Sequence, residues 1–316
     1  MNSTEALSRM IPPGQPRPGK PKRGVIQIWV TRACDKACYN CTQGANLKPQ
    51  KGVVPFISTE HFEQACKSLV DYFGTVGVFG GNPAIHPQFE TLCEILRSHI
   101  PFERRGLWCN RLMGKGEAAR RTFNPAVSNL NVHLDQEAHA EFRREWPESR
   151  PFGLNEDSRH SPVYVALQDI VSDESERWDL ISKCDINQHW SAMICVVRGQ
   201  LRGYFCEIAG AQAMLHQMDE DWPDVGVPID ANWWRRPMED FREQMELHCP
   251  GCGVPLRGHG ELAQAVNGTE QVSETHADIY QTKEPSRDTE VVTRRNQLHG
   301  QTAGRMTDYL GNARKP

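Results

Sequence analysis

The sequence predicts an α/β fold: a partial (β/α) TIM-like barrel of five to six strands, followed by a small cysteine-rich domain of a β-hairpin and helices. Apolar stretches of strand length alternate with amphipathic helical stretches through the first half of the chain, which is typical of parallel βαβ units. Polar residues recur directly after the predicted strands, where a barrel of this type keeps its functional groups. The 316 residues are sufficient for such a barrel with an additional small domain.

Changes in composition divide the chain into four regions. Residues 1–23 are rich in proline and glycine, and we expect a disordered or extended arm there. The partial barrel covers 24–183, and the cysteine-rich domain covers 184–264. Residues 265–316 are polar and lack apolar periodicity, so they predict an irregular tail.

The apolar pattern places the elements in order along the chain. Strands of the barrel are expected at 24–31, 75–79, 105–108, 127–134 and 163–167. Helices between and after them are expected at 58–73, 88–99, 137–145 and 173–183. The cysteine-rich domain begins with a hairpin whose strands cover 190–197 and 201–206 and continues with helices at 207–217 and 236–247.

Charge and hydropathy exclude several classes of partner. The net charge is −4, so neither nucleic acid nor an anionic membrane is an expected partner. No apolar run approaches the length of a membrane span or of a signal-peptide core. The eleven cysteines cluster in motifs instead of spreading as a disulfide framework, which favours metal ligands or reduced core thiols in a reducing, cytoplasmic location.

Three cysteines follow the first predicted strand in the spacing CxxxCxxC, namely Cys34, Cys38 and Cys41. Thiolates are the soft ligands that iron–sulfur clusters require, and three of them on one loop can hold three irons of a cubane while the fourth iron stays open to a small ligand. Free cysteines or a partial zinc site are the alternatives, although zinc loops usually carry a second cysteine pair nearby. The position at the end of a strand favours the cluster.

With Tyr39 directly after the second cysteine, this run resembles the CxxxC-aromatic-xC signature of the radical S-adenosylmethionine (radical SAM) superfamily. The resemblance implies that the open iron of a [4Fe-4S] cluster binds the amino and carboxylate groups of SAM. It further implies that one-electron reduction, by a reductant such as flavodoxin or ferredoxin, cleaves SAM to a 5′-deoxyadenosyl radical. In the superfamily this radical abstracts a hydrogen atom from the substrate.

The run Gly80-Gly81-Asn82-Pro83 ends the second predicted strand, where the Gly-Gly-Glu-Pro motif of this superfamily lies. In the family this motif holds the amino group of SAM, for which glycines permit close backbone approach and an acceptor meets the ammonium group. Asn82 replaces the acid, so its side-chain carbonyl can accept a hydrogen bond but carries no charge. A Gly-Gly turn that merely ends a strand is the alternative.

Further candidates for binding SAM lie after the next predicted strands. Asn110 ends the third strand, and strict alternation places Asn131, His133 and Asp135 on one face of the fourth. Such a polar face indicates a lined cavity, whereas a turn residue at Asn110 and a half-exposed strand are the alternatives. His133 is also a candidate catalytic residue, and Asp169, after the fifth strand, is another of the same kind.

A second set of cysteines consists of Cys184, Cys206, Cys249 and Cys252. It resembles the SPASM or twitch extension of the superfamily, in which a cysteine-flanked hairpin and later cysteines hold an auxiliary [4Fe-4S] cluster. The spacing departs from the family pattern, because six residues separate Gly199 from the next cysteine where the family has four. Four thiolates suit tetrahedral zinc equally well, so a zinc site is the alternative.

The remaining expectations concern one more thiol and the reaction. Cys195 lies mid-strand in the predicted hairpin and is expected in the core, with a role as hydrogen-atom donor as the alternative. The resemblance implies a small polar, carbohydrate-like substrate that undergoes dehydrogenation or epimerisation, because the residues before the first strand are too few for a peptide-binding domain. A peptide- or protein-modifying maturase and a non-catalytic iron–sulfur or zinc protein are the alternatives.

Overall fold

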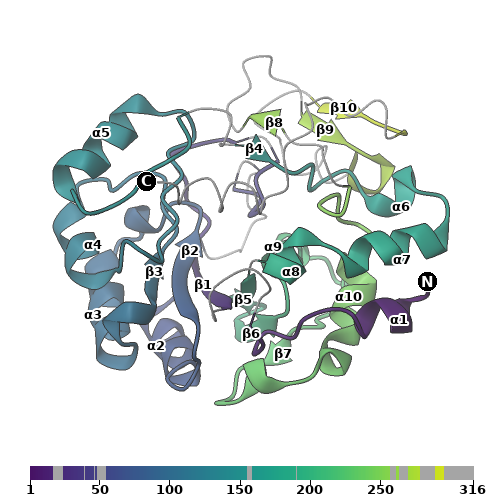
Figure 1. Cartoon of the computed structure of the whole chain (residues 1–316), viewed down its shortest axis with the longest axis horizontal. Helices are drawn as coiled ribbons and strands as arrows, with labels where there is room; N and C mark the ends of the chain where they lie inside the picture. Colours follow the sequence, from purple (N-terminus) through teal and green to yellow (C-terminus); the bar gives the residue numbers. More distant parts are fainter. Residues whose placement is uncertain are drawn as a thin grey trace.

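The computed structural model describes residues 1–16, 24–38, 40–45, 47, 55–154, 159–189, 191–256, 261–262, 270–277 and 289–294. Its centre is a six-stranded sheet with the order β3-β2-β1-β5-β6-β7 (Figure 1). The strands are β1 Val25–Thr31, β2 Thr75–Gly80, β3 Arg105–Leu107, β5 Ser191–Val197, β6 Gln200–Tyr204 and β7 Val227–Pro228. The α/β class predicted from the sequence is therefore confirmed.

Four neighbouring strands of this sheet run parallel, and two antiparallel strands complete it. β1 pairs in parallel with β2 and β5, and β2 with β3, whereas β6 runs antiparallel to β5 and β7 to β6. Val25 is level with both Thr75 and Ser191, so the parallel strands begin at one edge, the amino edge, and end at the other, the carboxyl edge. Within the described residues β3 and β7 bound the sheet, which is open and not closed into a barrel.

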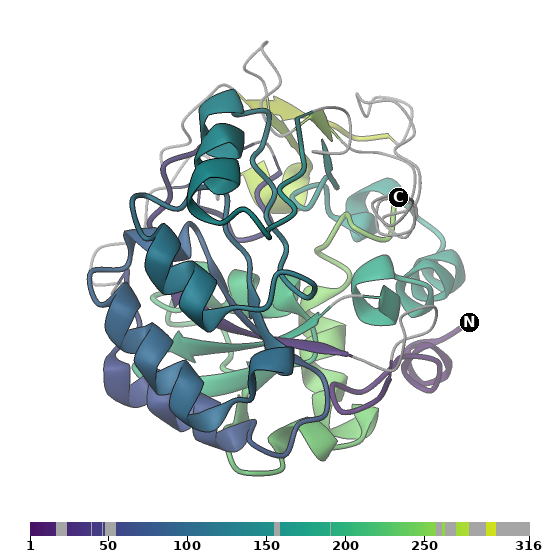
Figure 2. The ribbon, with the colours of Figure 1, turned by 60° about the vertical axis from the view of Figure 1, so that its left-hand side comes forward.

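Helices α2 Thr59–Ser68, α3 Phe89–His99, α4 Gly116–Thr122 and α5 Gln136–Glu145 pack one against the next beside the β1–β3 half of the sheet (Figures 1 and 2). Ser58 caps α2 by accepting a hydrogen bond from the backbone N–H of His61, which is the usual role of serine at this position. Phe62 on α2 and Phe89 on α3 are fully buried, so the apolar faces predicted from the sequence do point into the core.

Helix α9, Glu207–His216, lies against β5. A Cβ atom added to Gly210 would be 3.0 Å from Sδ of Met193, so the glycine lets the helix approach the strand closely. Alanine and glycine make up four of the ten residues of α9, and all but the last residue are buried. Because it is apolar on every side, the helix is an interior element of the molecule.

The same helix connects the two edges of the sheet. It begins at Cys206, just after β6 ends at Tyr204, which is paired with Met193 near the amino edge. Near its other end, Leu215 packs against Gly44, which follows the three-cysteine motif beyond the carboxyl edge. A single helix therefore extends from one predicted cysteine set to the other.

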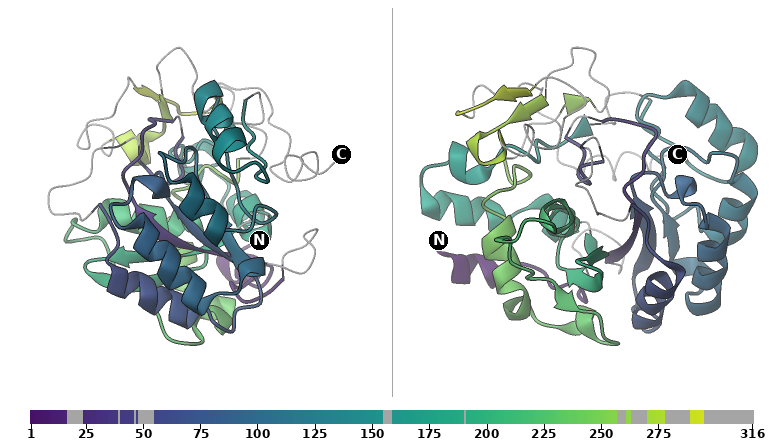
Figure 3. Two further views of the ribbon diagram at one scale, coloured as in Figure 1. Left: turned by 90° about the vertical axis from the view of Figure 1, so that its left-hand side faces the viewer. Right: turned by 180° about the vertical axis from the view of Figure 1, so that it is seen from behind.

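The remaining elements surround this centre. Helix α10 Arg242–His248 packs on α9, and α1 Ser3–Leu7 packs on α7 Glu174–Ser182 and on α10. Two small sheets, β4–β8 and β9–β10, lie close to each other (Figures 1 and 3). Their strands are β4 Arg159–His160, β8 Glu261–Leu262, β9 Glu270–Val272 and β10 Thr289–Val291, and the other helical segments are α6 Leu167–Ile170, α8 Asp185–His189, η1 Pro83–Ile85, η2 Phe102–Arg104, η3 Trp233–Arg235 and η4 Met238–Phe241. No helix in the described residues is long and apolar enough to span a bilayer.

Two strands predicted for the barrel are wrong. Residues 127–134 form only single bridges, between Trp108 and Asn129 and between Asn131 and Phe152. Positive φ angles at His133 and Leu134, 50° and 68°, turn the backbone away from the extended conformation. Residues 163–167 are buried without pairing as a strand and lead into α6, because a short apolar run indicates burial but not a particular secondary structure.

Three further expectations are corrected or completed. The predicted hairpin exists, but β5 pairs with β1, so the hairpin belongs to the central sheet and not to a separate small sheet. The arm predicted to be disordered or extended contains α1, in which Ala6 and Leu7 are buried. Of the predicted tail, the described residues form β9, β10 and a short helical turn, with Val272 and Val292 buried, and the rest lies outside the described residues.

Candidate functional site

The three-cysteine motif lies directly beyond the carboxyl end of β1. Cys38 is buried, Cys34 and Cys41 are half-buried, and all three are free thiols. Burial and the nearby Cys41 raise the pKa of Cys34 to about 12. The raised pKa of Cys34 favours its neutral thiol, which a cationic centre would convert to a thiolate. The neighbouring Tyr39 lies outside the described residues.

The glycine motif at the end of β2 packs against the backbone that leads into the cysteine loop. The backbone N–H of Gly81 donates to the carbonyl of Thr31 at 2.7 Å, and that of Asn82 donates to the carbonyl of Ala33 at 2.8 Å. A Cβ atom on Gly81 would lie 2.3 Å from the oxygen of Ala33, so only glycine allows this approach. In the structure the glycines therefore fix the position of Cys34 relative to β2.

Two side chains secure the far end of the same loop. Nη2 of Arg32, a buried side chain, donates to the carbonyl of Gly44 at 3.0 Å, and burial lowers the pKa of this guanidinium. The hydroxyl of Tyr164 donates to the carbonyl of Cys41 at 3.2 Å. Neither residue was predicted from the sequence. Tyr164 was missed because it lies in the segment wrongly predicted as the fifth strand.

Asn82 and the adjacent Pro83 are buried, and the side chain of Asn82 is fully engaged. Its Oδ1 accepts a hydrogen bond from the backbone N–H of Ala84 at 3.2 Å, which caps η1, and it lies 3.2 Å from Sγ of Cys109. Its Nδ2 donates to Oδ1 of Asp35 at 3.0 Å. The side-chain carbonyl that was expected to accept a ligand group is therefore already occupied by protein donors.

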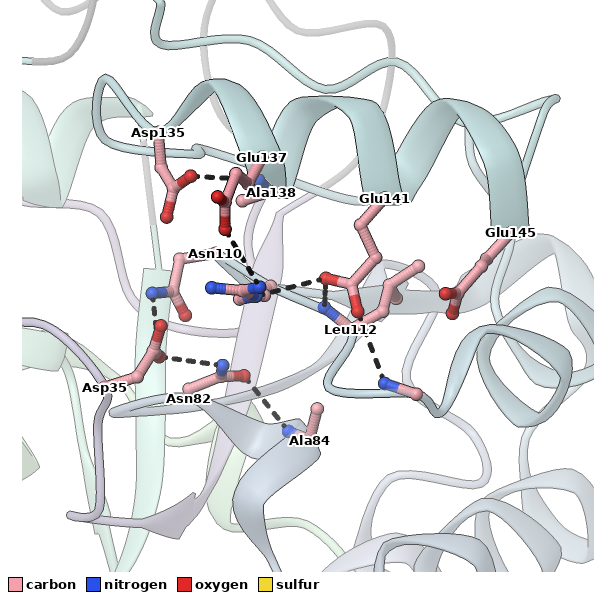
Figure 4. A network of polar contacts seen from close by, with 12 residues as sticks. Asp35, Asn82, Ala84, Asn110, Leu112, Asp135, Glu137, Ala138, Glu141 and Glu145 are labelled. Atoms are coloured by element: carbon pink, nitrogen blue, oxygen red, sulfur yellow. Dashed lines mark hydrogen bonds and ion pairs between the residues drawn. The ribbon is translucent and has the colours of Figure 1, made fainter.

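Asp35, inside the cysteine motif, receives a second amide as well. Nδ2 of Asn110, from the end of β3, donates to the same Oδ1 at 3.1 Å (Figure 4). Amides from two consecutive strand ends thus converge on one carboxylate next to Cys34. Sequence reasoning singled out Asn82 and Asn110 but missed Asp35, for which its position within the CxxxC spacing was the one available signal.

Asp135, from the segment predicted as the fourth strand, contacts Lys36, the residue after Asp35 in the cysteine loop. Nζ of Lys36 is 2.8 Å from Oδ2 of Asp135, and this lysine is almost completely buried. Burial acts to raise the pKa of Asp135, but the hydrogen bonds from Lys36 and from the backbone of Ala138 hold it below its usual value. Asp135 also caps α5 through Ala138, at 2.9 Å, so the lysine ties the cysteine loop to that helix.

Next to this pair, His133 and Asn131 hold the turn that replaces the predicted strand. The rings of His133 and His160 meet edge to face, with centroids 5.1 Å apart. Burial, and then the nearby His160 and Lys36, lower the pKa of His133 well below its ordinary value, so the ring is neutral. Asn131 accepts a hydrogen bond from the backbone of His133 at 3.0 Å.

Two predicted catalytic residues have their contacts elsewhere. The carboxylate of Asp169 accepts hydrogen bonds from the backbone and the hydroxyl of Thr275, each at 2.8 Å, and so fixes the C-terminal turn. The thiol of Cys195 is buried and points to the carbonyl of Gly210 on α9 at 3.8 Å. None of the contacts described for either side chain involves the three-cysteine loop.

The second cysteine set is assembled from three segments. Cys206 precedes the first residue of α9, Cys249 follows the last residue of α10, and Cys184 lies just before α8. Together with Cys252 they line one small cavity, whose other walls include Met10, Phe205, Ile208 and Val254. Residues that are 68 positions apart in the chain, from Cys184 to Cys252, thus face a common space.

The thiols of this second set also interact electrostatically. Burial, and then the charges of the other three cysteines, raise the pKa of Cys249 well above its usual value. Burial and Cys184 raise the pKa of Cys252 to about 12. Two buried and two half-buried cysteines whose charges raise one another's pKa form a site in which a cationic centre would remove the repulsion.

No group of three or more His, Cys, Asp or Glu side chains in the described residues could hold a metal ion as the side chains stand. Both cysteine sets are therefore assessed by the chemistry of their donors. All of these cysteines are free thiols, and soft sulfur donors suit an iron–sulfur cluster in both sets, with zinc as a further option in the four-cysteine set.

Comparison with known proteins found five similar chains among solved structures, including two structures of BtrN. No family model and no curated protein matches the chain. The structure of BtrN in complex with AdoMet and 2-DOIA is 12% identical, covers 72% of this chain and 88% of its own, and has a TM-score of 0.45. The structure of selenomethionine BtrN in an open conformation is 13% identical, with coverages of 79% and 94% and a TM-score of 0.38. The functional argument rests on the residues described above.

Proposed function

We propose that this protein is a radical SAM enzyme in which Cys34, Cys38 and Cys41 hold a [4Fe-4S] cluster. One observation supports the proposal most strongly: the residues expected from three successive strand ends to bind SAM all meet the cysteine loop. Asn82 and Asn110 bond to Asp35, and Asp135 bonds to Lys36. When bound, the cluster and SAM supply a 5′-deoxyadenosyl radical.

The protein's own residues orient and enclose this chemistry. The backbone contacts of Gly81 and Asn82 fix the loop beside Cys34, and Arg32 and Tyr164 close its far end. His133 adds a neutral, half-buried ring next to Lys36. A buried polar surrounding of this kind holds a charged ligand in one orientation and limits access of water to the reacting groups.

The reaction test is production of 5′-deoxyadenosine. Protein reconstituted anaerobically with iron and sulfide and given a strong reductant should convert SAM to 5′-deoxyadenosine. The variant in which Cys34, Cys38 and Cys41 are all replaced by alanine should not. If the unaltered, iron-loaded protein forms none, even slowly, a non-catalytic iron–sulfur or zinc protein becomes the better interpretation.

For the substrate we propose a small polar, carbohydrate-like molecule that is dehydrogenated or epimerised, as the sequence leads us to expect. Candidates deuterated at single carbons should transfer deuterium into 5′-deoxyadenosine when the correct carbon is labelled. A screen that includes peptides decides between this class and a peptide-modifying maturase, because only the true substrate class transfers the label.

We propose in addition that Cys184, Cys206, Cys249 and Cys252 hold a second [4Fe-4S] cluster. Their common cavity and their mutual effect on pKa support a shared cationic centre. Two cubanes predict about eight irons per chain, whereas one cubane with zinc predicts about four irons and one zinc. Replacing Cys249 and Cys252 with serine should lower the iron content by about four; an unchanged iron content with loss of zinc would assign zinc instead.

A further inference from the structure

Asn110 and Asp35, the residue after Cys34, each carry an acceptor atom to which no hydrogen bond is described within the described part of the chain. Oδ1 of Asn110 is buried, with the residue 4% exposed, and has no hydrogen-bond partner in the described part of the chain. The hydrogen bonds that Asp35 receives there both go to its Oδ1, so its Oδ2 can accept more. A 3.1 Å hydrogen bond from Nδ2 of Asn110 to Oδ1 of Asp35 joins the two side chains that carry these acceptors.

Within the described residues, the nearest basic side chains in the sequence pair with carboxylates other than that of Asp35. The adjacent Lys36 is directed to Asp135, at 2.8 Å. Arg111, which follows Asn110, interacts with Glu137 and Glu141, each at 3.6 Å. Among the described residues Asp35 forms no ion pair, although two amides donate hydrogen bonds to its carboxylate (Figure 4).

Asn82 cannot take the role expected for it from the motif. Its carbonyl accepts the N–H of Ala84, and the residue is 0% exposed, so no open side of this amide faces a ligand. The thiol of Cys109 is also 3.2 Å from this carbonyl, although its sulfur is nearer the carbonyl of Arg111, at 2.8 Å. Its remaining group is a donor that points to Asp35. A cationic ligand group therefore meets the carboxylate of Asp35 and not the amide of Asn82.

We propose that Asp35 binds the α-ammonium group of SAM, with Oδ1 of Asn110 as the second acceptor. An ammonium group has three N–H donors and a positive charge, which match a free carboxylate oxygen and an unpartnered carbonyl. The acidic charge missing at Asn82 is thus supplied from the cysteine loop, and Asn82 orients the acid that replaces it. This assignment rests on the proposed function, since it takes SAM as the ligand.

The test compares two ligands on Asp35→Asn. Dissociation constants are measured by anaerobic equilibrium dialysis on protein with equal iron content, for SAM and for 5′-methylthioadenosine, which lacks the amino-acid part of SAM. Loss of a charge-assisted hydrogen bond should weaken SAM binding by about tenfold or more and leave 5′-methylthioadenosine unaffected. Asn110→Ala should weaken SAM binding by a smaller factor, with the same selectivity.

A matched control is Glu137→Gln, which also removes a carboxylate on this side of the molecule. Its side chain is 83% exposed and has no contact with Asp35, so binding of SAM should be unchanged. Equal SAM affinity of Asp35→Asn and the unaltered protein overturns the assignment, as does equal weakening of both ligands. If the unaltered iron-loaded protein does not bind SAM, the proposed function itself fails.

Discussion

His133 is a half-buried, neutral histidine held in a left-handed turn at the site. Its pKa is well below the ordinary value because of burial and the nearby His160 and Lys36. In the unfolded chain, by contrast, this histidine binds a proton as the pH falls through about 6.5. The unfolded state therefore binds more protons below that pH, and the free energy of unfolding falls as the pH falls.

Replacing His133 with glutamine should make stability less sensitive to acid. The unaltered protein loses up to about 1.4 kcal/mol per pH unit from this group below about pH 6.5, and the variant lacks that loss. Urea unfolding at neutral and mildly acidic pH measures the difference, with His61→Gln on α2 as the control outside the site. If both variants keep the full pH dependence, His133 is protonated without penalty in the folded state.

At this scale the sequence predicted which residues gather but not how they bond. Asn82 and Asn110 were recognisable because polar residues at the ends of parallel strands share one edge of a sheet. Asp135 was predicted by the same rule, although it caps α5 and does not end a strand. Their partners were not recognisable, since Asp35 and Lys36 lie on an irregular loop whose backbone sets where each side chain points. Motif reasoning therefore assigned Asn82 a free carbonyl, which the cap of η1 in fact uses.

At the scale of elements, the contact between the end of β2 and the cysteine loop depends on the absence of a side chain at Gly81. Replacing Gly81 with alanine would place Cβ 2.3 Å from the carbonyl oxygen of Ala33. The backbone must move, so we expect a destabilisation of about 1–3 kcal/mol together with poorer assembly of the cluster. Urea unfolding and the iron content after reconstitution measure the two effects.

Gly251→Ala serves as the control for adding a methyl group to a loop glycine. The nearest atom to its added Cβ, the carbonyl oxygen of His248, would be 3.7 Å away, which is ordinary contact. This variant should therefore unfold at nearly the same urea concentration as the unaltered protein. Equal stability of Gly81→Ala would show that the loop can shift away from β2 without cost.

Strands were predictable where the apolar run also finds a pairing partner. β1, β2 and the β5–β6 hairpin were correctly located because their alternation and flanking turns agree with the final sheet. The segments 127–134 and 163–167 also contain apolar residues, but those residues are buried in loops and not in paired strands. Burial is encoded locally, whereas pairing depends on positive φ angles and on distant segments that a local pattern does not contain.

At the scale of the whole molecule, the N-terminal segment is part of the fold. Leu7 on α1 is 1% exposed, and α1 packs on α7 and α10. Replacing Leu7 with alanine should cost about 2–5 kcal/mol of unfolding free energy, because a buried cavity replaces the side chain. Arg9→Ala, at an exposed position on the same segment, should have little effect in the same urea titration.

The prediction of a disordered arm was wrong for its first residues, because the high proline and glycine content of residues 1–23 lies mainly after Ser3–Leu7. The helical residues Ser3–Leu7 precede most of the prolines and carry their own capping box, formed by Asn2 and Glu5. A Leu7→Ala variant as stable as the unaltered protein would contradict the packing of α1. The other predicted domain boundaries stay predictions. The β5–β6 hairpin at the start of the predicted cysteine-rich domain belongs to the central sheet.

Helix α9 also has an electrostatic consequence. Cys206, of one cysteine set, is the N-cap residue of the helix, and the last turn packs against Gly44 close to Cys41 of the other set. The ten helical residues extend over about 15 Å. The aligned peptide dipoles give the end at Cys206 about half a positive charge and the opposite end about half a negative charge. The helix thus polarises the interior along the line that joins the two sets, and it makes the Cys206 end the more favourable location for additional negative charge.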